Sequence, residues 1–139
     1  MNKKQKKVLI VITCIVIAST IFFYNKNRQE NKAVSNIIKE AYSTNITIRN
    51  NAIEKLKIFA SKGNSVAMYR YSEILLNLNK IQEAIQLLEL SSKAGDKKAT
   101  LLLGATYILE TEQKLKGFNL VNRLAEDGQP LAQSFLSFC

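Results

Sequence analysis

Three glycines recur at nearly constant spacing in this 139-residue chain: Gly63, Gly95 and Gly128 lie 32 and 33 residues apart. Five positions around each glycine hold matching residue types in all three copies. Small residues stand eleven before and four after each glycine, and large apolar residues stand ten before, seven before and eight after. A period of this length is typical of stacked helix pairs. The spacing therefore predicts an all-α fold for residues 31–139.

The residue types at these positions suit paired helices. A glycine just past a helix can take the left-handed conformation that ends it, and small residues let two helices approach closely. Asp96 and Thr111 are expected to cap helix N-termini, and Pro130 to lie in a first helical turn. The predicted helices span about 31–43, 48–62, 65–77, 80–94, 97–109, 112–126 and 130–138.

Two segments of the chain resemble Sel1-like repeats, which belong to the tetratricopeptide-repeat superfamily. They read SKAGDKKATLLLGATYIL and LAEDGQPLAQSFL. That family ends one helix with small residues and glycine, then places alanine four residues on and Leu-Gly at eight and nine. The matching residues here are Gly95, Ala99, Leu103 and Gly104, followed by Tyr107. The resemblance covers about residues 48–139, with 31–43 as a degenerate first helix.

Two departures from the family favour a mixed label. Sel1-like repeats usually carry a longer, glycine-containing loop between paired helices, whereas the loops at 77–80 and 110–113 are short. Ser72 and Ser137 replace Gly104 in the outer copies. The expected fold is a short α-solenoid of antiparallel helix pairs, Sel1-like or tetratricopeptide-like, with the last helix as a terminal cap.

An uncharged apolar run, residues 8–24, precedes the repeats and follows four lysines. As a helix it would be about 25 Å long, near the short end of what crosses a hydrocarbon core of about 30 Å. An uncleaved signal anchor fits it best. A cleaved signal peptide fits less well because residues 18–20 match a cleavage site poorly, and lipidation of Cys14 fits less well because the apolar run continues past it. A buried core helix fits less well because the run is apolar on every face.

The chain is thus expected to divide into a basic tail at 1–7, a transmembrane signal anchor at 8–24, a linker at 25–30 and the repeat domain at 31–139. A short basic N-terminus before a first span usually stays in the cytoplasm. We therefore expect a single-pass protein of a bacterial inner membrane, with the C-terminal domain in the periplasm. Cys14 and Cys139 would then lie too far apart to pair within one chain.

Charge and composition exclude several functions. The net charge of +9 divides into +6 for residues 1–32 and +3 for residues 33–139, which favours a role in membrane topology over nucleic-acid binding. The chain has no histidine, which excludes the histidine-dependent catalytic triads and zinc sites. The acidic pairs Glu110/Glu112 and Glu126/Asp127 are expected to be solvated surface residues. We expect no enzyme activity, no cofactor, no metal and no small-molecule substrate.

A partner-binding surface is expected on the concave face of the helical array. The resemblance implies that ligand-facing positions fall three, six, ten and thirteen residues after each glycine. These residues are Val66, Tyr69, Glu73, Leu76, Lys98, Leu101, Ala105, Ile108, Leu131, Ser134 and Phe138. Seven of the eleven are large and apolar or aromatic, which predicts a groove that binds a partner. The alternative is that a short array curls and buries several of them in its core.

The expected function is that of a membrane-anchored module that binds another protein. Sel1-like proteins of bacteria share a fold and differ in role, and some are immunity proteins that neutralise secreted antibacterial toxins. A small anchored domain without chemistry of its own suits that role, by family analogy alone. The alternative is an envelope adaptor, assembly factor or regulator that docks a subunit of a membrane complex.

Overall fold

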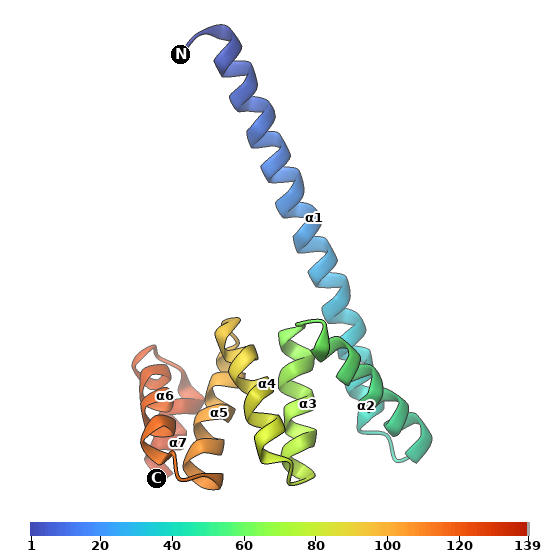
Figure 1. The fold of residues 1–139 in the computed structure, drawn as a ribbon, viewed down its shortest axis with the longest axis vertical. Helices are drawn as coiled ribbons and strands as arrows, with labels where there is room; N and C mark the ends of the chain where they lie inside the picture. Colours follow the sequence, from blue (N-terminus) through green and yellow to red (C-terminus); the bar gives the residue numbers. More distant parts are fainter. Residues whose placement is uncertain (139) are drawn as a thin grey trace.

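The computed structural model describes residues 1–138 and shows them as helices joined by short turns (Figure 1). Over these residues there are seven helices: α1 (Lys3–Ala41), α2 (Ile46–Ser61), α3 (Ser65–Asn77), α4 (Ile81–Lys93), α5 (Lys97–Glu110), α6 (Lys114–Glu126) and α7 (Pro130–Phe138). Each helix packs on the next one along the chain. The all-α prediction is confirmed for these residues, and the expectation about Cys139 lies outside them.

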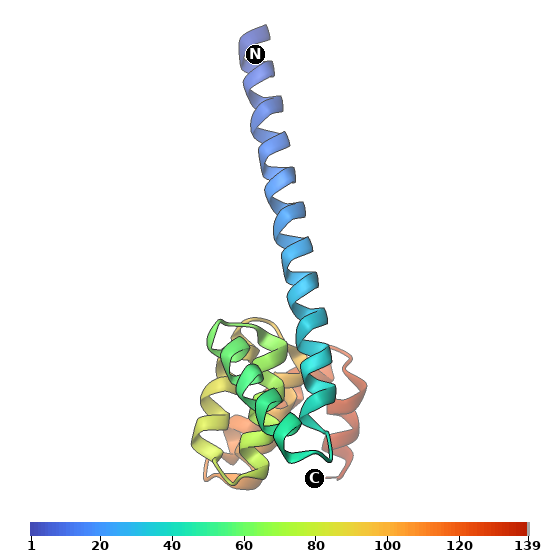
Figure 2. The ribbon, with the colours of Figure 1, turned by 90° about the vertical axis from the view of Figure 1, so that its right-hand side faces the viewer.

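Helix α1 is a single element of 39 residues, and its N-terminal part projects from the other helices as a rod (Figures 1 and 2). Residues 25–30, expected as a linker, are helical. The reason lies in their composition, because four of the six residues are long polar residues of good helix propensity and the segment has neither glycine nor proline. The predicted first helix at 31–43 is therefore the end of α1, which stops at Ala41.

The apolar part of α1 lies free of the rest of the molecule. Its most apolar 18-residue window has a mean hydropathy of 2.3, and none of it is buried. Among the described residues, α1 alone is long and apolar enough to cross a membrane. A membrane anchor and a signal sequence both have this character.

The C-terminal turns of α1 join the helical domain. Val34, Ile37 and Ala41 are buried in a core cluster with residues of α2 and α3. Asn64, at the start of α3, donates a hydrogen bond from Nδ2 to Oδ1 of Asn31 at 3.1 Å. This bond fixes the turn between α2 and α3 against the side of α1.

The three repeat glycines end helices in the predicted way. Gly63, Gly95 and Gly128 have φ angles of 84°, 89° and 76°. In each case the glycine N–H and the next N–H donate to carbonyls of the last helical turn, as in a Schellman motif. Asn79 ends α3 in the same manner with a φ of 59°, which the glycine spacing did not predict.

Three of the five repeat positions are buried in every copy. They hold the small residues eleven before and four after each glycine and the apolar residue seven before it. The members are Ala52, Ala84, Gly117, Ala67, Ala99, Ala132, Leu56, Leu88 and Val121. The repeat period therefore corresponds to a period of burial in the packed helices.

The predicted N-caps have different outcomes. Asp96 caps α5, and its carboxylate accepts hydrogen bonds from the N–H groups of Lys98 and Ala99. The prediction for Thr111 is wrong, because α6 begins only at Lys114, after Gln113. The Thr111 hydroxyl instead donates to the Tyr107 carbonyl and accepts from the Gln113 N–H. It therefore stabilises the turn that comes after α5.

Candidate partner-binding groove

A groove of about 300 Å³ lies across α3, α5 and α7, the first helices of successive pairs. We call it the concave groove. Its lining residues are Tyr69, Lys98, Leu101, Leu102, Ala105 and Leu131. Five of these six come from the eleven predicted partner-binding residues. Stacking of equivalent positions thus brings together residues that lie as far apart in sequence as Tyr69 and Leu131.

The apolar surface continues from the concave groove along α5. A second hollow, of about 190 Å³, shares Leu102 and Ala105 with it and extends to the turn that ends α3. Leu76, another predicted residue, lines this second hollow. The two hollows together follow α5 over most of its length.

Other predicted residues lie outside the concave groove. Val66 is half-buried against the core cluster formed by α1, α2 and α3. Glu73 is half-buried and forms an ion pair with Arg70 at 2.9 Å. Ser134 and Phe138 lie on α7, and neither lines the groove. The structure therefore brings Tyr69 and Leu101 together but leaves Phe138 apart from them.

Ile108 corrects the expected set of groove residues. Its side chain is only 8% exposed and lies in the core cluster with Val121, Leu124 and Ala132. The missing side chain at Gly117 gives it this space, because a Cβ there would lie 2.7 Å from Cγ1 of Ile108. Ile108 therefore packs between α5 and α6 and has little surface to offer a partner.

Leu102 is the groove residue that the sequence did not predict. It lies seven residues after Gly95, between the positions that the family resemblance assigns to the concave face. Its side chain is half-buried against the core cluster of α4 and α5 and also lines both hollows. No signal in the sequence separates it from the core leucines beside it.

The groove is mainly apolar and carries a cation, Lys98, at its edge. Burial, assisted by the Glu73 carboxylate, raises the pKa of Tyr69 to about 12, so its hydroxyl is neutral at physiological pH. The Arg70 guanidinium lies 5.2 Å from the centre of the Tyr69 ring and pairs with Glu73. Lys98 is exposed, and no carboxylate of the described residues lies within 4.0 Å of its ammonium.

A separate polar cluster joins α4, α5 and α6. The Tyr107 hydroxyl donates to Oε1 of Glu89 at 2.6 Å, and Lys116 donates to that oxygen at 3.1 Å and to the Tyr107 oxygen at 2.6 Å. The Lys116 ammonium also lies 4.2 Å from the Tyr107 ring centre. The Tyr107 and Lys116 hydrogen bonds lower the pKa of Glu89, and hydrogen bonds to Tyr107 and Glu89 raise the pKa of Lys116. Each of the three side chains is hydrogen-bonded to the other two, so the cluster is a structural tie between helices.

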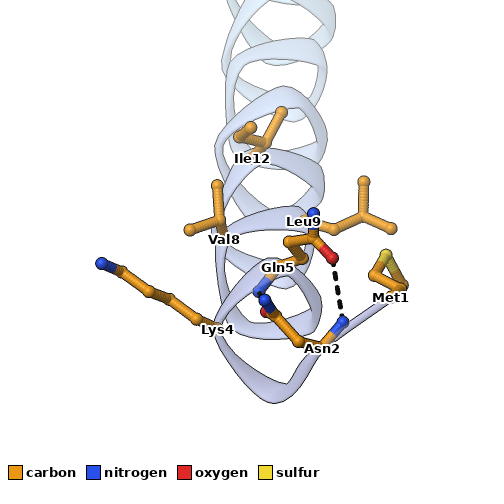
Figure 3. Close-up of a pocket in the computed structure, with 7 residues that line it drawn as sticks. All are labelled: Met1, Asn2, Lys4, Gln5, Val8, Leu9 and Ile12. Carbon is orange, nitrogen blue, oxygen red and sulfur yellow. Dashed lines mark hydrogen bonds between the residues drawn. The ribbon is translucent and has the colours of Figure 1, made fainter.

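Residues 1–138 contain no group of three cysteine, aspartate or glutamate residues arranged to hold a metal ion. A hollow of about 590 Å³ at the N-terminus is lined by Met1, Asn2 and residues of the N-terminal turns of α1 (Figure 3). There the Asn2 N–H donates to Gln5 Oε1 at 2.9 Å and completes a capping box. This hollow belongs to the exposed helix end, with no second element to enclose a ligand.

Comparison of the chain with protein-family models, curated proteins and solved structures found no match.

Proposed function

We propose that this chain is a membrane-anchored module that binds a segment of another protein in the concave groove. The observation that carries the proposal is the meeting of Tyr69, Leu101 and Leu131, from three different helices, in one apolar hollow. Leu131 is 66% exposed, so the apolar surface faces solvent and is available to a partner. Aromatic and aliphatic side chains in such a hollow are typical anchors of a protein interface.

The partner segment is proposed to carry a large apolar side chain next to a carboxylate. The apolar side chain would lie in the hollow of the groove, between Tyr69 and Leu101. The carboxylate would pair with Lys98 at the groove's edge, because that ammonium has no acidic partner among the described residues. Such a pair chiefly steers the encounter and sets the orientation of the bound segment.

The finer classification is part of the proposal. We propose that the paired helices form a short Sel1-like α-solenoid, supported by the buried repeat positions and by the glycines that end α2, α4 and α6. We further propose that α1 is an uncleaved anchor and that the helical domain faces the periplasm of a bacterial cell. The exposed apolar run of α1 and the lysines before it support this topology.

Two biological roles fit this architecture. One is an immunity protein that neutralises a secreted antibacterial toxin, and the other is an envelope adaptor, assembly factor or regulator that docks a membrane-complex subunit. Both roles use the same groove and need no chemistry from the domain itself. Neighbouring genes discriminate between them: a toxin gene favours immunity, and an operon of envelope machinery favours the adaptor.

The test is capture of the partner from the native membrane by the full chain, followed by Tyr69→Ala and Leu101→Ala. Truncation of a central anchor typically weakens binding by about 2 kcal/mol or more, which is about thirtyfold in affinity. Leu115→Ala is the matched control, because Leu115 is 75% exposed on α6 and lies outside the groove. If both groove variants melt like the parent and bind the captured partner with parental affinity, the concave groove is not the site.

A further inference from the structure

We propose that the end of the helical domain that carries the glycine turns docks on anionic phospholipid headgroups of the membrane that holds α1. The inference rests on the anchor in the proposed function. It concerns a different surface from the concave groove and a different partner, a lipid surface.

The geometry of α1 sets the distance between this end of the domain and the membrane. The hydrogen bond between Asn31 and Asn64 places the turn between α2 and α3 beside residue 31 of α1. Residue 31 lies seven residues beyond Tyr24, where the apolar run ends, so the axial distance is about 10 Å in an uninterrupted helix. A bilayer has about 5–8 Å of headgroup layer on each side of its hydrocarbon core. The turn therefore lies at the outer edge of the headgroups.

All three glycine turns lie at this same end. Figures 1 and 2 show the turns after α2, α4 and α6 toward the N-terminal part of α1, and the turns after α1, α3 and α5 at the opposite end. The alternation results from the antiparallel packing of consecutive helices, each of which reverses the chain direction. A continuous α1 keeps this end of the domain on the membrane side, and the tilt of α1 sets how closely its turns approach the headgroups.

Basic side chains are concentrated on the turns closest to α1. Lys62 comes directly after α2, and Lys93 and Lys97 flank the glycine turn between α4 and α5. Asp96, which caps α5, is the acidic residue of that turn. All three lysines are exposed, and among the described residues none has a carboxylate within ion-pair distance. Residues of α1 between the apolar run and the domain add Lys26, Arg28 and Lys32, against Glu30 alone.

The charge reverses at the far end of the array. The turn between α6 and α7 carries Glu126 and Asp127, and it is the glycine turn farthest from α1 along the stack. The lipid contact is therefore confined to the turns after α2 and α4. These turns lie close enough to the membrane for attraction, since the Debye length at physiological ionic strength is about 8 Å. Each basic residue near an anionic surface favours the docked state about fivefold.

Energy transfer in reconstituted vesicles tests the docking. The chain has no tryptophan, so Ala94→Trp, in the exposed turn after α4, supplies a single donor. The full chain is inserted into vesicles with dansyl-labelled headgroups, made of phosphatidylcholine alone or of an equal mixture with phosphatidylglycerol. We expect higher transfer in the anionic mixture and a fall to the neutral-vesicle level when Lys62, Lys93 and Lys97 are all changed to glutamine. Added salt should have the same effect as the triple change.

The matched control changes three lysines at the opposite end of the domain. Lys39, Lys80 and Lys114 lie near the turns after α1, α3 and α5. Lys39 lies eight residues beyond Asn31 on α1 and so is about 12 Å farther from the membrane, whereas Lys80 and Lys114 are about 20 Å farther, the length of a 13-residue helix such as α4. Their change to glutamine should leave the transfer unaltered. Equal transfer in neutral and anionic vesicles, or equal loss in both triple variants, overturns the docking.

Flotation of the same vesicles in high salt separates the two proposals. A chain that floats with the vesicles but shows no charge-dependent transfer retains its anchor and lacks the docking. A chain that does not float contradicts the anchor, and the docking with it.

Discussion

Two glycines determine how closely α5 and α6 approach. A Cβ on Gly117 would lie 2.5 Å from the Gly104 carbonyl oxygen, and one on Gly104 would lie 2.7 Å from Cγ2 of Val121. Both distances are shorter than atoms tolerate, and one partner is backbone that cannot move without shifting the helix. The sequence signalled Gly104 through its family position, and it signalled Gly117 as a small residue of the repeat.

Gly117→Ala is expected to destabilise the domain. Alanine gains about 1 kcal/mol of helix propensity over glycine, but overpacking of a tight contact typically costs about 1–3 kcal/mol. We expect the loss to prevail, because the added methyl group meets the Gly104 carbonyl and the Ile108 backbone together. The measurement is the free energy of unfolding in urea.

Asn119→Ala is the control for Gly117→Ala, since Asn119 is exposed on the same helix and reports propensity alone. A Gly117→Ala protein as stable as this control would show that α5 and α6 can separate freely at this point.

At the scale of the helices, the polar cluster of Glu89, Tyr107 and Lys116 makes the stability of the domain depend on pH. The cluster lowers the pKa of Glu89 below its ordinary value of about 4.5. A carboxyl with a lower pKa in the folded state adds stability that is complete above the unfolded value and is lost as the pH falls through the folded one. The contribution of Glu89 to the tie between α4, α5 and α6 should therefore be lost in acid.

Glu89→Gln is expected to reduce the acid sensitivity of unfolding. The variant should be less stable than the parent at neutral pH and should approach it as the pH falls below about 4.5. Thermal melts across that range check the prediction. Glu54→Gln is the control, because Glu54 is exposed and belongs to no ion pair among the described residues. Parallel pH curves for Glu89→Gln and the parent would contradict the role given to this cluster.

The order of the helices could be predicted from the sequence because glycine, small and apolar residues recur with one period. Ends set by strong local chemistry were predictable, as at Gly63 and Asp96. Helix ends that depend on weaker signals were not predictable. Asn79 takes a left-handed conformation although it is not glycine, and the Thr111 hydroxyl donates a hydrogen bond to a carbonyl of α5. The continuity of α1 was missed because a polar stretch after an apolar run was interpreted as a linker.

The concave groove was only partly predictable for a related reason. The family resemblance assigns residues to the concave face by their distance from each glycine, and five of those residues line the groove: Tyr69, Lys98, Leu101, Ala105 and Leu131. The resemblance does not give the distance to the next helix, which decides whether a residue at the margin of that face is core or surface. Ile108 is buried because Gly117 lets α6 come close. Leu102, one position beyond Leu101, is partly open because it lines the two hollows along α5.

For the whole molecule, the topology is the prediction with the widest consequences. Reporter fusions after the last residue should be active only when the reporter works outside the cytoplasm, because four lysines precede the apolar run of α1. The N-terminus should also remain unprocessed, which mass measurement of the purified chain checks. Activity of a cytoplasmic reporter alone would reverse the orientation, and a shortened chain would show a cleaved signal sequence.

In the proposed anchored topology, the unbroken helix α1 also makes the orientation of the domain around the helix axis depend on the number of residues between the membrane and the domain. Each residue of an α-helix rotates the chain by about 100° around the helix axis and advances it by about 1.5 Å along that axis. The number of residues between Tyr24 and Val34 therefore sets two quantities: the height of the concave groove above the bilayer, and the direction around the helix axis in which the groove opens. One residue more or fewer would swing the groove through more than a quarter circle. Seven more residues would return the groove almost to its original orientation, about 10 Å farther from the bilayer.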